Sequence, residues 1–179
     1  DQDRRYRAGP NGIPHRSAVR TPDALRIAVR SNLIALQAQL NETVNLWVLE
    51  GVLVRNLDGI ESTEALAIRV NAWDRVPAYI SAAGKALLAC LSDEEVRRMH
   101  GNRLPPWPSS HIPSMSALLD HLARVRRRGY ATNMEEVAQG VFGVAVALRT
   151  PEGEPIAALS TGVPGVRFSR SRGEQIARL

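Results

Sequence analysis

The sequence predicts an α+β domain in which a mainly antiparallel sheet of about five or six strands packs against helices. Three observations lead to this class. Short alternating runs between residues 44 and 70 follow one another with only turns between them, as antiparallel strands do. Residues 22–40 have the apolar spacing of an amphipathic helix. A second pair of strands, 143–149 and 155–162, is joined by a short turn.

The first helix is predicted from its start signal and its apolar stripe. Thr21 is a good N-cap, and Pro22 fits the first helical position. The stripe repeats every three or four residues over about five turns and consists of Leu25, Val29, Leu33, Leu36 and Leu40. We expect this stripe to be buried against the rest of the domain or against a partner chain.

The first strands are predicted as a hairpin followed by a third strand. Residues 44–48 alternate in the period of a strand, 50–51 form a turn, and 52–57 return. The Asp-Gly pair at 58–59 is expected to end the hairpin. Residues 64–70 are interpreted as the third strand.

The middle of the chain is predicted to be helical. Residues 81–91 form a helix with small residues at its start, and Ser92 with Glu95 makes a capping box for a second helix reaching His100. After a proline-rich loop over 101–113, Ser114 caps a further helix that ends at Gly129. The three arginines before Gly129 are interpreted as a solvated cap that complements the helix dipole.

The two ends of the chain are interpreted as borders of the domain. Residues 1–21 are rich in turn formers and arginine, so they predict a linker or loop, with 5–8 as the one short strand candidate. A last helix begins near Ser169 and has no stop signal before Leu179, which predicts a truncation at this end.

Composition places the chain among soluble, cytoplasmic proteins. No run of 18 apolar residues and no secretory signal is visible, and the single cysteine, Cys90, rules out an internal disulfide. The net charge of +5 suggests nucleic acid as a partner. However, all basic residues except Lys85 are arginine, and aromatic residues make up only 4%. An ordinary arginine-rich surface is therefore the favoured interpretation, and no membrane contact is predicted.

Catalytic and metal-binding patterns are scarce, so we predict a non-enzyme without metal or cofactor. The four histidines lack metal-ligand spacing, and the Gly-Lys at 84–85 is not followed by Ser or Thr as a phosphate loop requires. Lys85 is a candidate for Schiff-base chemistry, but a solvated residue or a tether to a carboxylate is favoured. Glu135 and Glu136 could act as acid and base, but neighbouring residues in an extended segment point to opposite sides. We expect one to face solvent and the other to cap or pair.

A face of small residues on the late strand pair is the best candidate site. It consists of Gly143, Ala145 and Ala147 on one strand and Ala158, Ser160 and Gly162 on the next. Small side chains leave volume, and Ser160 adds one polar point, as a small-molecule pocket requires. A helix packed closely on this face is an equally good interpretation. The helix that opens at Ser81 supports the pocket, because its first amides have no intrahelical acceptors and Ala82 and Ala83 allow close approach of an anion.

Several collinear motifs resemble one known family. They are NETVNL at 41–46, PAYISAAGKALLACLS at 77–92, LARVRRRGY at 122–130, MEEVAQGV at 134–141, and VAV at 144–146 with AALS at 157–160. In this order over residues 22–179 they are similar to the C-terminal, effector-binding domain of IclR-type (isocitrate lyase regulator-like) bacterial transcription regulators.

The resemblance implies a GAF/PAS-like sheet, and a winged helix-turn-helix and linker helix on the N-terminal side. Residues 1–21 resemble the remnant of the wing and linker, and 22–179 the effector domain. DNA would then be bound by the domain missing from this chain, not by this fragment. Effectors of the family are small organic or aromatic acids. Members are homodimers or homotetramers that repress or activate catabolic operons.

The resemblance also places ligand-binding positions on this sequence, at Ala82, Ala83, Asn133, Gly143, Ser160 and Gly162. Relatives with a small-carboxylate site have Asp, Cys and Ser where this chain has Asn133, Gly143 and Gly162, and Asp74 replaces a family glycine. We therefore expect a roomier, less polar pocket that suits a bulkier acid, such as an aromatic one. Gly143→Val is expected to fill this pocket in a domain that stays folded. The alternatives are a ligand-free dimerisation scaffold or, less favoured, an enzyme on a PAS-like fold.

Overall fold

The computed structural model describes residues 21–101 and 103–179. Its elements in chain order are α1 (Pro22–Leu40), β1 (Thr43–Glu50), β2 (Leu53–Ile60), the 3-10 helix η1 (Val70–Ala72), β3 (Arg75–Pro77), α2 (Ala82–Leu88), α3 (Asp93–His100), α4 (Met115–Arg128), β4 (Ala131–Met134), β5 (Val141–Arg149), β6 (Pro155–Pro164), the 3-10 helix η2 (Gly165–Arg167) and α5 (Arg170–Ile176). The linker and strand expected before residue 21 lie outside the described residues. None of the helices described is long and apolar enough to cross a membrane.

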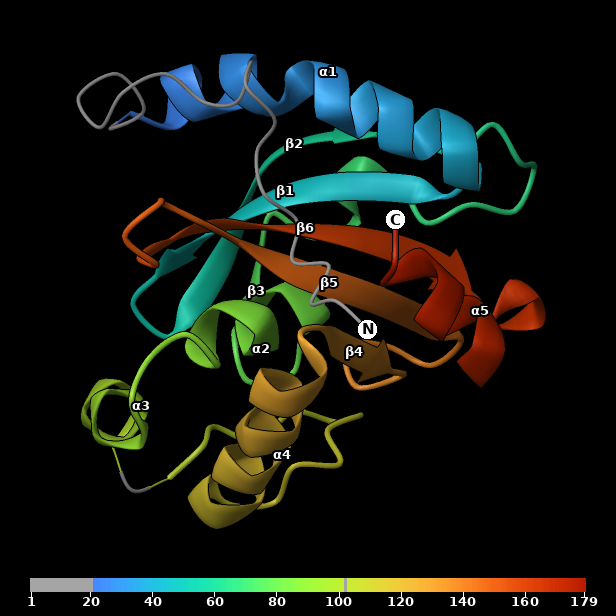
Figure 1. Cartoon of the computed structure of the whole chain (residues 1–179). Coiled ribbons are helices and arrows are strands. Elements are labelled where there is room, and N and C mark those ends of the chain that lie inside the picture. The colour runs from blue at the N-terminus through green and yellow to red at the C-terminus, as the bar shows by residue number, and fades with distance from the viewer. Residues whose placement is uncertain (1–20, 102) are drawn as a thin grey trace, which may run out of the picture.

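All six strands form one sheet in the order β3-β2-β1-β6-β5-β4, and each neighbouring pair is antiparallel (Figure 1). The predicted α+β class, with a mainly antiparallel sheet of about five or six strands, is therefore confirmed. Two hairpins, β1–β2 and β5–β6, meet where β1 pairs with β6. The fourth strand, β4, was not predicted.

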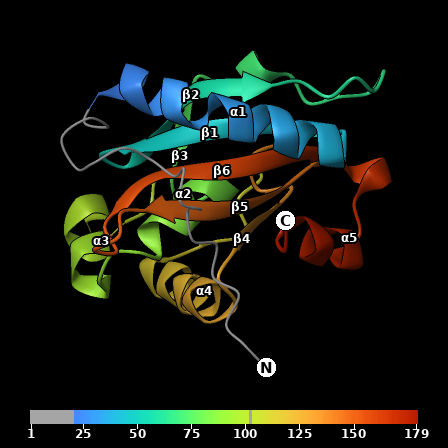
Figure 2. The ribbon, with the colours of Figure 1, turned by 45° about the horizontal axis from the view of Figure 1, so that its top comes forward.

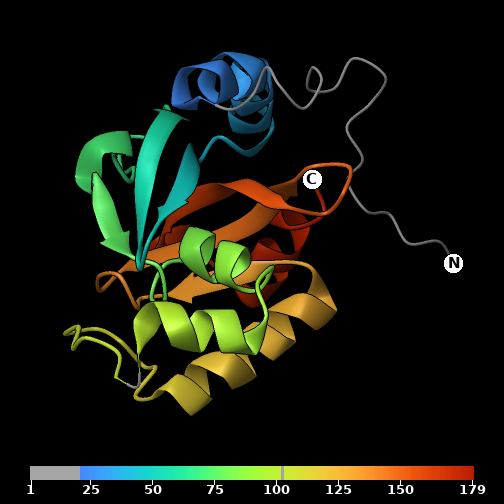
Figure 3. The same cartoon turned by 90° about the vertical axis from the view of Figure 1, so that its left-hand side faces the viewer.

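Helices cover both faces of the sheet. Figure 2 shows α1 lying along β1 and β2, and Figure 3 shows α1 on one side of the sheet and α2, α3 and α4 on the other. Alternating residues of one strand serve the two layers: Leu46 packs into the core under α1, and its neighbour Trp47 packs into the core around α2 and α4. The short α5 packs against the ends of β5 and β6 through Ile176.

The first helix matches its prediction at both ends. Thr21 accepts the Ala24 N–H through its side chain, Pro22 occupies the first turn, and Asn41 ends the helix in the left-handed conformation at φ 49°. Leu25, Val29 and Leu33 are buried against the apolar side chains of β1, β2 and β6. The stripe was expected to be buried either against the rest of the domain or against a partner chain, and the structure shows the first of these.

Two predictions for the first strands are wrong. The Asp-Gly pair at 58–59 lies inside β2, because the ladder with β1 continues to the pair Val44–Ile60 and accommodates an unpaired Leu57 as a bulge. Residues 64–70 form no strand. The third strand is Arg75–Pro77, which pairs with residues 53–55 of β2. The ladder between β2 and β3 ends there, and Asn56 contacts the segment before β3 through its backbone N–H to Asp74 and its side chain to Val70.

The helical predictions in the middle of the chain are confirmed, with one change in detail. Both hydrogen bonds of the capping box between Ser92 and Glu95 are present, and Gly129 ends α4 at φ 84°. The first of the three arginines does more than face solvent, because Arg126 donates to the Ala89 and Leu91 carbonyls at the end of α2. The last helix ends at Ile176 rather than running to Leu179.

Candidate ligand-binding site

The face of small residues forms as predicted, and its members face one another across the β5–β6 ladder. Gly143 pairs with Gly162, Ala145 with Ser160, and Ala147 with Ala158. The short helix α2 lies over this face (Figure 3). A Cβ added to Gly143 would lie 3.9 Å from the Ala82 Cβ and only 2.7 Å from the Thr161 carbonyl oxygen. The structure therefore argues against open space at position 143, and we expect Gly143→Val to destabilise the domain rather than leave it unperturbed.

The start of α2 is fixed against the backbone before it. Ser81 caps the helix, since its Oγ accepts the Gly84 N–H at 2.9 Å. Gly84 touches the chain at Ala78, where an added Cβ would lie 2.2 Å from the carbonyl oxygen. These contacts hold Ala82 and Ala83 at the edge of the small-residue face. Their amides are in the first helical turn, which has no intrahelical acceptors.

A small cavity of about 60 Å³ lies between the sheet face, the start of α2 and two loops. All six residues predicted for the site line it: Ala82, Ala83, Asn133, Gly143, Ser160 and Gly162. The structure thus brings together positions that are far apart in the chain. Sequence reasoning missed the large apolar walls, which include Trp47, Ile68, Trp73 and Phe142.

The polar groups of the cavity are already engaged with the protein. Trp47 Nε1 donates to Ser160 Oγ at 2.9 Å. Asn133 Oδ1 accepts the backbone N–H groups of Glu136 and Val137, and its Nδ2 donates to the Val141 carbonyl. Asn133 therefore shapes the loop between β4 and β5, while the hydroxyl hydrogen of Ser160 is still available as a donor to a ligand.

A buried ion pair joins α2 to the same loop. Lys85 Nζ lies 2.6 Å from Oε1 and 2.5 Å from Oε2 of Glu136, and the exposed fractions of the two side chains are 0% and 4%. Burial lowers the pKa of Lys85, and the charge of Glu136 opposes that shift. The tether interpretation of Lys85 is confirmed. Glu135 turns the other way at φ 65° and accepts the Gly140 N–H, so the two glutamates do not form an acid–base pair.

Comparison with known proteins identifies the family. Residues 18–179 match the family described as "Bacterial transcriptional regulator IclR C-terminal". The chain belongs to the IclR family. The IclR-type domain is 33% identical to an HTH-type transcriptional regulator of Mycobacterium tuberculosis over 91% of this chain and 62% of that protein. It spans between about half and two thirds of the length of the curated relatives that it matches.

Solved relatives of this IclR-type domain confirm the expected GAF/PAS-like architecture. The C-terminal domain of the Escherichia coli regulator KdgR has a TM-score of 0.74 and 29% identity, with 86% of this chain and 90% of that chain covered. An IclR homologue from Microbacterium hydrocarbonoxydans, solved in complex with 4-hydroxybenzoate, has a TM-score of 0.74 and 28% identity, with 88% of this chain and 65% of that chain covered.

The cavity of this IclR-type domain is small in this conformation. A volume of about 60 Å³ is far below the roughly 300–1,000 Å³ of pockets that enclose small molecules. That the pocket is roomier than in relatives with a small-carboxylate site stays a prediction. The glycines do remove side chains, but Ile68 fills the space over Gly162, where an added Cβ would lie 3.0 Å from it. Room for a ligand therefore requires a wall to move.

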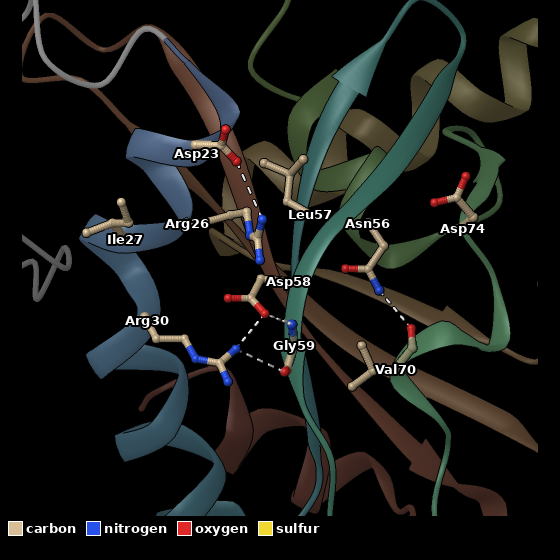
Figure 4. Close-up of a pocket in the computed structure, with 10 residues that line it drawn as sticks. All are labelled: Asp23, Arg26, Ile27, Arg30, Asn56, Leu57, Asp58, Gly59, Val70 and Asp74. Carbon is tan, nitrogen blue, oxygen red and sulfur yellow. Dashed lines mark hydrogen bonds and ion pairs between the residues drawn. The ribbon is translucent and has the colours of Figure 1, made fainter.

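A larger groove of about 850 Å³ on the surface was not predicted from the sequence. It lies between α1, β2 and η1 (Figure 4). Four of its charged side chains form ion pairs with one another, since Arg26 contacts Asp23 and Arg30 contacts Asp58. In the part of the chain described here, no group of three His, Cys, Asp or Glu residues is placed to hold a metal ion.

His121 on α4 makes the stability of the domain sensitive to acid. Burial, together with the positive charges of Lys85, Arg124 and Arg128, lowers its pKa from 6.5 to about 3. Between pH 6.5 and about 3, His121 is protonated in the unfolded chain and neutral in the folded chain. The free energy of unfolding therefore falls as the pH drops below about 6.5. Between pH 7.5 and 4.5, the free energy of unfolding of the His121→Gln variant should fall by about 1–2 kcal/mol less than that of the wild type. This figure allows for solvent screening at the partly exposed ring. Urea unfolding of both proteins across this range measures the difference, and parallel curves would contradict the prediction.

Proposed function

We propose that this chain is the effector-sensing domain of an IclR-type transcriptional regulator and that its ligand is a small organic acid, preferably an aromatic one. The observation that supports this most is that all six residues predicted for the site line one cavity. Trp47, Trp73 and Phe142 supply flat apolar walls that suit a ring.

The polar end of the ligand would lie at the start of α2. The amides of Ala82 and Ala83, which have no intrahelical acceptors, would receive a carboxylate, and the Ser160 hydroxyl would donate a further hydrogen bond. Asn133 would act through the loop that it shapes rather than by direct contact. Gly143 and Gly162 would let the ring lie against the sheet.

The activity of the whole protein is part of the same proposal. The effector would alter the binding of an operator by a winged helix-turn-helix outside residues 22–179, in the cytoplasm and without catalysis or a cofactor. Self-association as a homodimer or homotetramer would need surfaces other than the buried stripe of α1. The outer face of α1, with Ile27 and Ile34 exposed at 79% and 51%, is available for it.

Thermal unfolding in the presence of 4-hydroxybenzoate, benzoate, pyruvate and succinate tests this function. A ligand at 100 times its Kd raises the stability by about 2.7 kcal/mol. We expect the aromatic acids to raise the Tm more than the aliphatic ones, and chromatography to recover them unchanged. Consumption of an acid would favour the enzyme alternative. A Tm that no acid shifts would favour the ligand-free scaffold.

Ser160→Ala gives a residue-level prediction for the same site. It removes a hydroxyl that serves the ligand and also leaves the buried Trp47 Nε1–H without its acceptor. We expect ligand binding to weaken by about 0.5–1.5 kcal/mol and unfolding to become easier by about 1–3 kcal/mol. Calorimetric titration and urea unfolding measure the two effects. Ser31→Ala on the exposed surface of α1 is the control and should change neither the ligand affinity nor the free energy of unfolding. If the two variants bind the ligand equally well, Ser160 does not belong to the site.

A further inference from the structure

One wall of the cavity is a segment without a strand, here named the roof segment, residues 61–74. Ile68, Val70 and Trp73 of this segment line the cavity, and Ile68 occupies the space over Gly162. Apart from η1, the segment consists of turns and irregular backbone. Most of the hydrogen bonds and ion pairs that hold the segment are at the surface. An example is the ion pair of Arg69 with Glu61, whose side chains are 77% and 39% exposed.

The opposite wall, the loop between β4 and β5, is fastened much more firmly. It is held by the buried pair of Lys85 and Glu136, by the two hydrogen bonds to Asn133 Oδ1, and by Trp107 Nε1 donating to the Val137 carbonyl. Of the two loops around the cavity, the roof segment is therefore the one that can move at lower cost.

Asn56 on β2 holds the roof segment at two points. Its backbone N–H donates to the Asp74 carbonyl at 2.9 Å. Its side-chain Nδ2 donates to the Val70 carbonyl at 2.7 Å and to Asn45 Oδ1 at 3.2 Å. Figure 4 shows this side chain reaching from β2 to Val70. Asn45 itself lines the cavity from β1, so Asn56 is joined to both the roof and the floor.

The same side chain is incompletely satisfied in this conformation. Asn56 Oδ1 is buried, and among the residues that the structure describes no donor lies within hydrogen-bond distance of it. Reversing the amide would not help, because both groups now facing Nδ2 are acceptors. A buried acceptor without a donor raises the free energy of the closed conformation relative to one in which solvent reaches it.

We propose that Asn56 is a latch that closes the roof segment over the cavity and sets the cost of admitting a ligand. The proposal rests on the proposed function in one respect, namely that an effector occupies this cavity. A ligand that enters must displace Ile68 from the space over Gly162, and the accompanying movement of the roof segment releases Val70 from Asn56. The apparent affinity is then the intrinsic affinity reduced by the fraction of molecules with the roof open.

Asn56→Asp tests the latch with a side chain of the same size. The carboxylate cannot donate, and it faces the Val70 carbonyl and Asn45 Oδ1, which are both acceptors. Hydrogen–deuterium exchange of peptides covering 66–76, without ligand, should become at least about tenfold faster, while peptides from β5 and β6 keep their protection. Leu66→Ala is the control, because this side chain is 56% exposed on the same segment and should leave exchange unchanged.

Stopped-flow tryptophan fluorescence with 4-hydroxybenzoate gives a second measurement. If Asn56 is the latch, association with the Asn56→Asp variant is several times faster than with the wild type and the apparent Kd is lower. Asn56→Ser, which is too short to span to Val70, should act in the same direction and serves if the aspartate variant does not fold.

The outcomes separate the latch from the proposed function. Faster exchange at 66–76 with no binding of any acid supports the latch and overturns the ligand. If both variants bind the acid normally, with unchanged hydrogen–deuterium exchange at 66–76 and an unchanged association rate, Asn56 is not a latch. The proposed ligand is then still supported.

Discussion

Gly84→Ala is expected to destabilise the domain by more than about 3 kcal/mol or to prevent folding, because a single methyl group would overlap the backbone of Ala78. The added Cβ would lie 2.2 Å from the Ala78 oxygen and 2.3 Å from its Cα. Neither atom belongs to a flexible side chain, so α2 would have to move away from the backbone at Ala78. The expected loss is the opposite of what helix propensity predicts, since alanine is the better helix former. Urea unfolding monitored by circular dichroism measures the change.

Gly173→Ala on α5 is the matched control for this prediction. Its added Cβ would meet the ring of Phe168 at 3.0 Å, and a ring tip can shift. We expect that variant to stay within about 1 kcal/mol of the wild type. A Gly84→Ala domain as stable as the Gly173→Ala domain would show that α2 does not pack as closely as the structure has it.

Breaking the buried pair of Lys85 and Glu136 is expected to cost about 3–5 kcal/mol. Lys85→Met leaves the buried Glu136 carboxylate without its ammonium partner, and among the residues that the structure describes the Met134 N–H is the remaining hydrogen-bond donor. Glu136→Leu leaves the ammonium group equally uncompensated. The double variant removes both charges, so it should be more stable than the sum of the two single changes predicts.

A double-mutant cycle in urea measures this coupling, which we expect to be favourable by about 2 kcal/mol or more. The exposed pair of Arg98 and Glu94 on α3 is the control, with side chains 72% and 88% exposed. Arg98→Ala should change stability by no more than about 0.5 kcal/mol. Additive effects of Lys85→Met and Glu136→Leu would mean that the two groups do not depend on each other.

Much of the fold could be predicted because local signals and packing agree. The cap at Thr21, the capping box at Ser92 and the glycine at 129 mark helix ends through contacts within one turn, which a sequence displays directly. The pairing of Gly143 with Gly162 follows from two short strands joined by a short turn.

The prediction of a strand over 64–70 was wrong for a physical reason. The apolar residues there are spaced like one face of a strand, but Ile68 is used to cover Gly162 and the Val70 carbonyl is used by Asn56. The third strand is only three residues long, which is too short to leave a pattern. Long-range contacts of this kind are not encoded in local periodicity.

The candidate site was predictable in its floor and not in its walls. The pattern of small residues predicted the sheet face and the start of α2, and the resemblance to a family predicted that Asn133 belongs to the site. Trp47 and Trp73 carried no signal, because a tryptophan in a strand or a loop is as often ordinary core. The present closure of the cavity could not be read from glycines alone, since the side chain that fills the space comes from another part of the chain.

The buried pair also constrains how this domain can be assembled. Lys85 and Glu136 are 51 residues apart, and α3, α4 and β4 lie between them. A charged Lys85 that is buried without Glu136 is uncompensated, so we expect α2 to pack on the sheet only when the loop after β4 is also in place. We therefore expect a fragment that ends between these two residues not to fold stably. For the same reason, exchange of either segment with a homologue should require exchange of the other.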